Sequence, residues 1–153
     1  MKAVVTGAGG QLARELERTT PHDVELVSLS IEDLDITDQA SVAKRIAMES
    51  PDVLINAAGY TAVDKAEEEE ELAMLVNQDG VRYLALAANT SGAKFVHVST
   101  DFVFDGMNST PYEPNHTPNP LSAYGRSKLA GEAEVQEVCG EHGLIVRTTW
   151  LYS

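Results

Sequence analysis

The sequence has few cysteines and few basic residues, and it lacks any long apolar run. Cys139 is the only cysteine among 153 residues, so no disulfide can form within the chain and a reducing, cytoplasmic location is expected. The 11 Lys and Arg residues against 24 Asp and Glu give a formal net charge of −13, which argues against nucleic acid and anionic membranes as partners. No 18-residue apolar run occurs, so no transmembrane helix is expected.

The residues that are present indicate one folded domain, because 43% are hydrophobic and 23% are charged. Strand and helix patterns alternate along the chain, which predicts an α/β fold. We expect a Rossmann-type, doubly wound parallel sheet with helices on both faces in three layers, and the first strand inside the sheet. The expected strands are 2–6, 24–30, a short strand end over 34–38, 52–58, 93–100 and 143–150. The expected helices are 10–18, 38–49, 68–89 and one that begins near 121.

Two further segments have distinctive composition. The acidic run Glu67–Glu71 is expected to be a solvated helix start, where carboxylates favour the helix dipole. The proline-rich residues 111–120 are expected to form a functional loop. Cys139 is expected to pack within a helix rather than to act as a nucleophile.

A glycine motif follows the first expected strand. Gly7, Gly10 and Ala13 fit a G-x-x-G-x-x-A pattern that lets the strand turn tightly, lets the backbone approach a pyrophosphate and lets helix and strand pack closely. The helix N-terminus then presents free N–H groups to the phosphates. An ordinary tight turn is the alternative, but the position between a strand and a helix favours dinucleotide binding.

The choice between NADP and NAD stays open in the sequence. An acidic residue at the end of the second strand would bind the ribose 2′-hydroxyl and favour NAD. This chain has Ser28 and Ser30 there, and Glu32 and Asp33 come slightly late. Arg14 could meet a 2′-phosphate or could be a plain surface residue. The sequence therefore predicts NADP(H) or NAD(H).

Tyr124 and Lys128 lie four residues apart at the start of an expected helix, so they share one helix face. A protonated Lys128 would lower the pKa of Tyr124 towards working pH, and the phenol could then give a proton to a carbonyl oxygen. Thr100, at the end of a strand, would hold that oxygen. The alternative is a surface pair on an amphipathic helix.

The remaining candidates have plainer interpretations. Ala57, Ala58 and Gly59 leave a strand end as small residues against which a cofactor could lie. His97 is interpreted as a core histidine, and the other histidines show no metal-ligand spacing. Trp150 could be core packing or the wall of a ring-shaped ligand site.

A series of motifs covers essentially the whole chain and resembles the dTDP-4-dehydrorhamnose reductase family of the extended short-chain dehydrogenase/reductase superfamily. In chain order they are "GAGGQLARELE", "LDITD", "DVLINAAGYTAVDKAE", "VNQDG", "VSTDFVFDG", "AYGRSKLAGE" and "RTTWLY". The resemblance implies NAD(P)H-dependent reduction of the 4-keto group of a dTDP-6-deoxy-hexulose to dTDP-L-rhamnose. Gly59 stands where the family commonly has a third alanine.

The resemblance also assigns roles to residues. It implies the catalytic set Thr100, Tyr124 and Lys128. The implied cofactor contacts are Gly7, Gly10, Gln11, Leu12, Asp35, Ile36, Ala57, Ala58, Tyr60 and Lys128. The implied substrate contacts are Thr61, Val63, Thr100, Asp101, Phe102, Tyr124 and Trp150. Asn77 matches an asparagine that supports the site, and Glu15 a glutamate that some members use in a magnesium-linked dimer contact.

Length is the main departure from the family. Members continue beyond the "RTTWLY" strand into a region that grips the sugar nucleotide, so residues 1–153 are expected to form the NAD(P)-binding Rossmann domain without the C-terminal substrate domain. A homodimer or a completing chain is a candidate partner. Two alternatives stay open: a non-catalytic NADP-binding module that resembles the methionine adenosyltransferase regulatory subunit, and another extended short-chain enzyme such as an epimerase.

Overall fold

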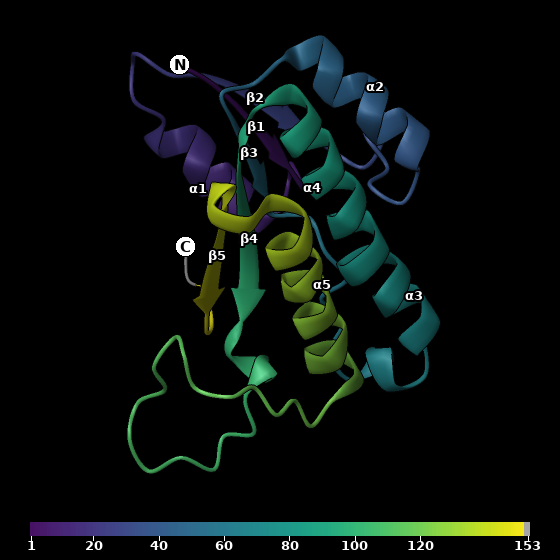
Figure 1. Cartoon of the computed structure of the whole chain (residues 1–153), viewed down its shortest axis with the longest axis vertical. Coiled ribbons are helices and arrows are strands. Elements are labelled where there is room, and N and C mark those ends of the chain that lie inside the picture. Colours follow the sequence, from purple (N-terminus) through teal and green to yellow (C-terminus); the bar gives the residue numbers. More distant parts are fainter. Residues whose placement is uncertain (152–153) are drawn as a thin grey trace.

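The structure, a computed structural model, describes residues 1–151, and a parallel five-stranded sheet forms its centre (Figure 1). The strands are β1 (Lys2–Thr6), β2 (Glu25–Leu29), β3 (Val53–Asn56), β4 (Lys94–Thr100) and β5 (Gly143–Thr148). Their order is β2-β1-β3-β4-β5, so β1 lies inside the sheet, as the sequence predicts. The chain changes direction across the sheet between β1 and β3, which is where doubly wound folds bind ligands.

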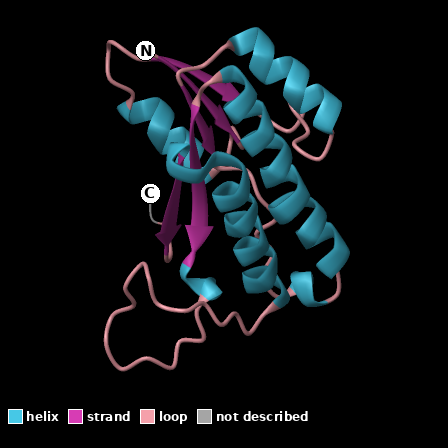
Figure 2. Cartoon of the chain, in the orientation of Figure 1, coloured by secondary structure: helices cyan, strands magenta, loops and turns pink. Residues whose placement is uncertain are grey.

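Helices cover both faces of the sheet, but unequally (Figure 2). The α-helices are α1 (Gln11–Thr19), α2 (Gln39–Glu49), α3 (Glu70–Met74), α4 (Gly80–Ser91) and α5 (Ala123–Cys139). Short 3₁₀ segments are η1 (Lys65–Glu67), η3 (Asp101–Val103) and η4 (Gly140–His142), and η2 (Leu75–Asp79) is a π-helical turn. Helices α2, α4 and α5 pack side by side on one face, and of the described helices α1 alone lies on the other. The three predicted layers are confirmed.

The thin helix layer leaves part of the sheet open to solvent. On β5, Arg147 reaches α5 to bind Glu132, so the alternating residues Leu144 and Val146 point to the opposite face. Their side chains are 56% and 42% exposed. The core therefore lies between the sheet and the α2–α4–α5 layer, where Leu54, Leu84 and Phe95 are fully buried.

Local sequence signals explain most element boundaries. The Asp38 carboxylate caps α2 by accepting hydrogen bonds from the backbone N–H groups of Ala40 and Ser41. Helix α2 ends at Ser50, directly before Pro51, and α4 ends at Gly92. The observed strands and helices start or end within a few residues of the predicted positions.

Two predicted elements are wrong in detail. Residues 34–38 form turns rather than a strand end, although Leu34 and Ile36 are buried in the core. The predicted helix 68–89 is not one regular α-helix, because the π-helical turn η2 lies between α3 and α4. A π-turn arises where an extra residue is accommodated in a helix, often at a functional site. Among the described residues, no helix is long and apolar enough to cross a membrane.

Candidate active site

One cleft of about 780 Å³ lies at the carboxyl ends of the strands, within the size range of ligand sites. It joins the glycine turn after β1 to Tyr124 and Lys128 on α5, which are more than a hundred residues away in sequence. The fold therefore brings the predicted dinucleotide turn and the tyrosine–lysine pair into one cleft.

The glycine turn has no space for a side chain at Gly7. Gly7 has φ +82°, and a Cβ placed on it would lie 2.8 Å from the Ala57 carbonyl carbon and the Ala58 nitrogen. The Gly10 N–H donates to the Gly7 carbonyl oxygen at 3.0 Å and closes the turn. Ala13 is buried at 1% exposure where α1 packs on the sheet. Gly7 and Ala13 therefore have the tight-turn and close-packing geometry predicted for them, and the role of Gly10 at a pyrophosphate stays a prediction.

The N-terminus of α1 opens into this cleft. Its N-cap is Gly10, and no side chain caps the helix. The first-turn N–H groups of a helix have no partner within the helix, so they can bind an anionic group. Gln11 and Leu12, in that first turn, line the cleft. The Gln11 side-chain amide also donates to the Leu151 carbonyl oxygen at 3.1 Å, which brings the end of the described chain over the cleft.

The residues after β2 line the part of the cleft where the sequence analysis expects a ribose to bind. The carboxylate of Asp33 is engaged within its own turn, because Oδ2 accepts hydrogen bonds from the Ser30 backbone N–H and hydroxyl. These two hydrogen bonds lower the pKa of Asp33. Ile31 and Glu32 line the cleft. Arg14 is exposed and lies outside the lining, so the structure favours its plainer interpretation as a surface residue.

Lys128 is buried, at 5% exposure, on the inner face of α5. Its Nζ donates to the Val98 carbonyl oxygen at 2.7 Å. Burial lowers the pKa of Lys128 to about 8, and the carboxylate of Glu132 opposes that shift. The lysine therefore titrates close to neutral pH and still carries a proton below pH 8.

Tyr124 corrects one expectation. Burial raises the pKa of Tyr124, a hydrogen bond with Thr100 opposes the rise, and Asp101 adds to it. Burial, rather than the charge of Lys128, sets the direction of this shift, and the Lys128 ammonium group is directed to the Val98 carbonyl oxygen. The Phe102 ring meets the Tyr124 ring edge-on, with centroids 5.7 Å apart. In this structure the phenol is thus held protonated.

Asn77, on the π-turn η2, links the two sides of the site. Its Oδ1 accepts from the Tyr60 N–H at 2.9 Å, and its Nδ2 donates to the Tyr60 carbonyl oxygen and to Ser127 Oγ. The Ser127 hydroxyl donates in turn to the Tyr124 carbonyl oxygen at 2.8 Å. A Cβ on Gly131 would collide with the Asn77 carbonyl oxygen, so glycine allows η2 and α5 to approach this closely.

Most predicted site residues line the cleft. Those that do are Gly7, Gly10, Gln11, Leu12, Asp35, Ile36, Ala57, Ala58, Tyr60, Thr61, Thr100, Tyr124 and Lys128. Four predicted substrate contacts do not line it: Val63, Asp101, Phe102 and Trp150. Phe102 lies beside Tyr124, and Trp150 is 77% exposed, so it is not a core residue. Tyr152 of the "RTTWLY" motif lies outside the described residues.

Several cleft residues escaped the sequence reasoning. Val98 contributes a backbone carbonyl to Lys128, which no side-chain motif could reveal. Thr148 and Leu151 line the cleft because the chain turns over it after β5. Their position directly after the last strand was the available signal, because ligands bind at the carboxyl ends of strands.

In the acidic run 67–71, Glu70 and Glu71 form the exposed first turn of α3, as predicted, but the run also binds neighbouring segments. Glu67 Oε1 accepts the backbone N–H of Ala123 at the first turn of α5. Glu69 accepts the Tyr60 hydroxyl hydrogen at 2.8 Å, and Glu70 pairs with Arg126. The run fixes the end of α5 that holds Tyr124, and α3 begins only at Glu70.

Two single residues behave as structural groups. Cys139 is 5% exposed at the end of α5, and burial raises the pKa of its thiol, as expected for a packing residue. His97 is fully buried; its Nδ1 lies 3.1 Å from the Asn56 amide nitrogen. His97 Nε2 has no hydrogen-bond partner among the described residues. Burial, together with the charge of Lys128, holds the pKa of His97 well below its usual range.

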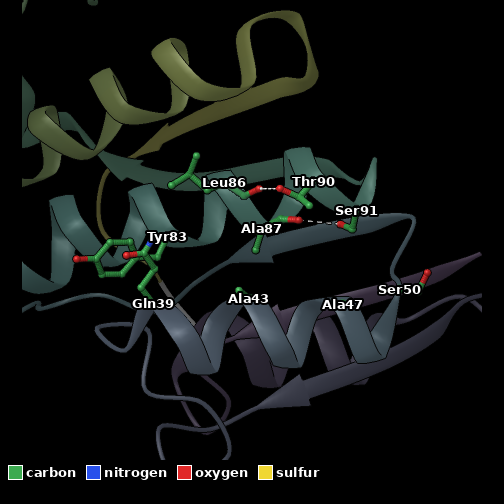
Figure 3. Close-up of a pocket in the computed structure, with 9 residues that line it drawn as sticks. All are labelled: Gln39, Ala43, Ala47, Ser50, Tyr83, Leu86, Ala87, Thr90 and Ser91. Carbon is green, nitrogen blue, oxygen red and sulfur yellow. Dashed lines mark hydrogen bonds between the residues drawn. The ribbon is translucent and has the colours of Figure 1, made fainter.

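A second hollow, of about 380 Å³, lies between α2 and α4 (Figure 3). Its lining is mainly alanine and hydroxyl residues, and no charged side chain is among the described residues that form it. Figure 3 shows that Thr90 and Ser91 use their hydroxyls on carbonyl groups of their own helix. Its one tyrosine, Tyr83, has no lysine beside it in the described lining, so the larger cleft is the candidate active site.

Comparison with known proteins shows the family of the chain. A family model described as "RmlD substrate binding domain" matches residues 1–153. The chain is 44% identical over 153 residues to a dTDP-4-dehydrorhamnose reductase of Sinorhizobium fredii, covering 100% of this chain and 51% of that protein. It is 41% identical over 157 residues to the reductase of Salmonella typhimurium, covering 100% and 52%.

Solved structures give the same result. A dTDP-4-dehydrorhamnose reductase from Clostridium acetobutylicum superposes with a TM-score of 0.96 at 44% identity, covering 100% of this chain and 55% of that one. A Bacillus anthracis reductase in complex with NADP gives 0.95 at 40% identity, covering 99% and 54%. A UDP-glucose 4-epimerase from Brucella ovis, at 18% identity, shares the fold. The chain spans about half the length of its curated relatives, and it belongs to the dTDP-4-dehydrorhamnose reductase family.

Proposed function

We propose that this chain binds a nicotinamide dinucleotide and carries the proton-donating side of a 4-keto sugar reductase acting on a dTDP-6-deoxy-hexulose. The observation that carries the proposal is the single cleft that holds both the uncapped N-terminus of α1 and the Thr100, Tyr124 and Lys128 side chains. The names of the curated relatives support this reaction class. The alternative of a non-catalytic module is not favoured, because that cleft keeps all three catalytic groups.

The residues fit a dinucleotide. The α1 N-terminus and the Gly7–Gly10 turn would offer free N–H groups to the pyrophosphate. The turn lies so close to Ala57 and Ala58, directly after β3, that a Cβ at Gly7 would collide with them. Ala57 and Ala58 give a flat wall of backbone and methyl groups. When bound, the nicotinamide supplies the hydride for the carbonyl carbon. Every other requirement of the reaction falls on side chains of this chain.

Tyr124 is the proton donor in this proposal. Reduction of a ketone needs a proton on the developing alkoxide, so the donor must be protonated before the step. The raised pKa of Tyr124 keeps that proton in place at neutral pH. The Thr100 hydroxyl, which donates to Asp101 Oδ1 at 3.2 Å in this structure, would orient the carbonyl oxygen. Protonated Lys128, one turn further along α5, stabilises the phenolate that remains after transfer.

The preferred cofactor is NADP(H) or NAD(H). No carboxylate directly follows β2, and Asp33 is engaged by Ser30, which removes the usual reader of the ribose 2′-hydroxyl. Glu32, in the cleft lining, would repel a 2′-phosphate. These features act in opposite directions, so we propose use of both cofactors. Titration of NADPH and NADH by tryptophan fluorescence would give two affinities; a hundredfold preference for either would contradict dual use.

The sugar nucleotide contacts and the assembly are also proposals. Val63, Asp101, Phe102 and Trp150 would reach the sugar from outside the described cleft, with a C-terminal region of a longer chain or a second copy completing the grip. Magnesium at Glu15 has little support, because Arg18 already pairs with that carboxylate and no cluster of three metal-binding side chains occurs within residues 1–151. A cytoplasmic location fits this biosynthetic role.

The test is a single-turnover assay of NADPH oxidation with a dTDP-4-keto-6-deoxy sugar, with enzyme in excess. For residues 1–153 tested alone we expect oxidation far slower than that of a relative of twice the length measured alongside, because distant parts of a substrate contribute binding energy to catalysis. Tyr124→Phe should abolish the reaction while NADPH still binds. Tyr83→Phe, in the hollow between α2 and α4, is the matched control and should change neither. Full rates would refute the expected weakness, and reduction by Tyr124→Phe would refute the proposed donor.

A further inference from the structure

A buried carboxylate lies one helical turn beyond Lys128. Glu132 is 1% exposed, and Lys128 is 5% exposed. Both lie on α5, and residues four apart on a helix share a face, with Cβ atoms about 5–6 Å apart. A carboxylate is rarely this buried without a role or a partner. Glu132 therefore needs an explanation beyond packing.

Arg147 holds the Glu132 carboxylate in a fixed orientation. From β5, its Nε donates to Oε1 at 2.9 Å and a terminal nitrogen donates to Oε2 at 2.6 Å, in a bidentate pair. The guanidinium lies 5.0 Å from the centre of the Phe104 ring and also donates to the Pro114 carbonyl oxygen at 3.1 Å. The arginine is thus fixed on three sides, and it holds the Glu132 carboxylate in a bidentate ion pair.

Lys128 has no ion-pair partner among residues 1–151, and its Nζ hydrogen bond goes to a neutral carbonyl. From β4, His97 faces it as a neutral ring. From η3, Asp101 acts on Tyr124 rather than on Lys128.

The other charged groups around α5 are engaged elsewhere. Glu134 binds Arg82 of α4 and Gln78 of η2. Glu67 and Glu70, from η1 and α3, bind the first turn of the helix at Ala123 and Arg126. Glu132 is accordingly the one anionic group, among the described residues packed around Lys128, that favours its charged form.

We propose that Glu132 is a positioning residue that helps to keep Lys128 protonated at neutral pH, with Arg147 fixing the orientation of the carboxylate on the same helix face. The inference deepens the proposed function, because only a charged Lys128 can stabilise the phenolate of Tyr124. Burial alone penalises the lysine charge, and an opposite charge within about 4–6 Å favours it by 1–3 pKa units. Glu132 thus offsets part of the burial penalty that brings the pKa of Lys128 to about 8.

The test measures the Lys128 titration directly, in the chain without cofactor. The protein is labelled with ¹³C- and ¹⁵N-lysine, and the Lys128 side-chain signal is assigned as the one missing from Lys128→Arg. In Glu132→Gln we expect the midpoint of that signal to fall by about one pH unit. Glu132→Asp, which withdraws the carboxylate by one methylene, should give a smaller fall in the same direction.

Glu134→Gln is the matched control. It removes a buried carboxylate of the same helix that is also paired with an arginine, but its partner lies on α4. This variant should lose stability and leave the Lys128 midpoint unchanged. A folded Glu132→Gln with the wild-type midpoint would overturn the proposal. If that variant does not fold, an unchanged midpoint in Glu132→Asp would overturn it equally.

A second readout connects the titration to the site. NADPH affinity should fall as the pH rises through the Lys128 midpoint. In Glu132→Gln this fall should begin at a lower pH than in the wild type, and in Glu134→Gln it should begin at the same pH. A structural role alone would lower stability without moving either midpoint. The NMR result stands apart from the reductase proposal, whose own failure would appear as ketone reduction by Tyr124→Phe.

Discussion

Replacing Gly7 by alanine tests the geometry of the glycine turn. Two penalties act on a methyl group at this position. The backbone has φ +82°, a left-handed conformation that costs a non-glycine residue about 1–2 kcal/mol. The new Cβ would also lie 2.8 Å from three backbone atoms of Ala57 and Ala58, and overpacking against backbone costs about 1–3 kcal/mol. Gly7→Ala should therefore lower the free energy of unfolding by about 2–5 kcal/mol.

Gly9 provides a matched control two residues away. Its φ is +84°, but no atom lies within 4 Å of a Cβ placed on it. Gly9→Ala thus incurs the backbone penalty of about 1–2 kcal/mol without the collision. The difference between the two variants isolates the close approach of the turn to the strand end that follows β3.

The assay is urea unfolding followed by circular dichroism, paired with NADPH titration at a temperature where both variants are folded. Gly7→Ala should also weaken NADPH binding, because relief of the collision must displace either the turn or the Ala57–Ala58 wall of the cleft. Equal losses of stability in the two variants would refute the argument. So would a Gly7→Ala variant that loses stability yet binds NADPH with unchanged affinity.

The buried ionisable groups give two further predictions. Lys128 has a pKa of about 8 in the folded chain and 10.5 as its ordinary value, so the unfolded chain binds more protons between these pH values and stability should rise with pH across them. The free energy of unfolding of Lys128→Met should exceed that of the wild type at pH 7, and the gap should narrow by about 3 kcal/mol by pH 10.5; parallel curves would contradict this. His97 is held neutral, so the wild type should lose stability below pH 6.5 more steeply than His97→Gln in acid titrations of the melting temperature; equal slopes would contradict it.

The sequence predicted the sheet because its signals are local. Short apolar runs mark the buried parallel strands, and Asp38, Pro51 and Gly92 mark helix ends through side-chain or backbone chemistry that acts within a few residues. The turns at 34–38 were mistaken for a strand end because Leu34 and Ile36 are buried without being in the sheet. Burial alone does not distinguish a core-facing turn from a strand.

The sequence predicted which residues form the site, but it did not predict their hydrogen-bond partners and pKa shifts. Spacing placed Tyr124 and Lys128 on one helix face, but it could not show that the ammonium group is directed to the Val98 carbonyl oxygen of a strand thirty residues away. The predicted sign of the Tyr124 pKa shift was wrong because burial, which spacing does not show, raises that pKa. The helix start in the acidic run was predicted, but its contacts were not, because Glu67, Glu69 and Glu70 find partners that are close only in the folded chain.

The central claim is that the Gly7–Gly10 turn and the Tyr124–Lys128 pair contact one bound dinucleotide. An NMR titration of the ¹⁵N-labelled chain with NADPH tests it most directly. The account predicts that the amides of Gly7, Gly10 and Gln11 and those of Thr100 and Lys128 shift together, with one shared dissociation constant. Shifts confined to the glycine turn, with Thr100 and Lys128 unmoved at saturation, would contradict it.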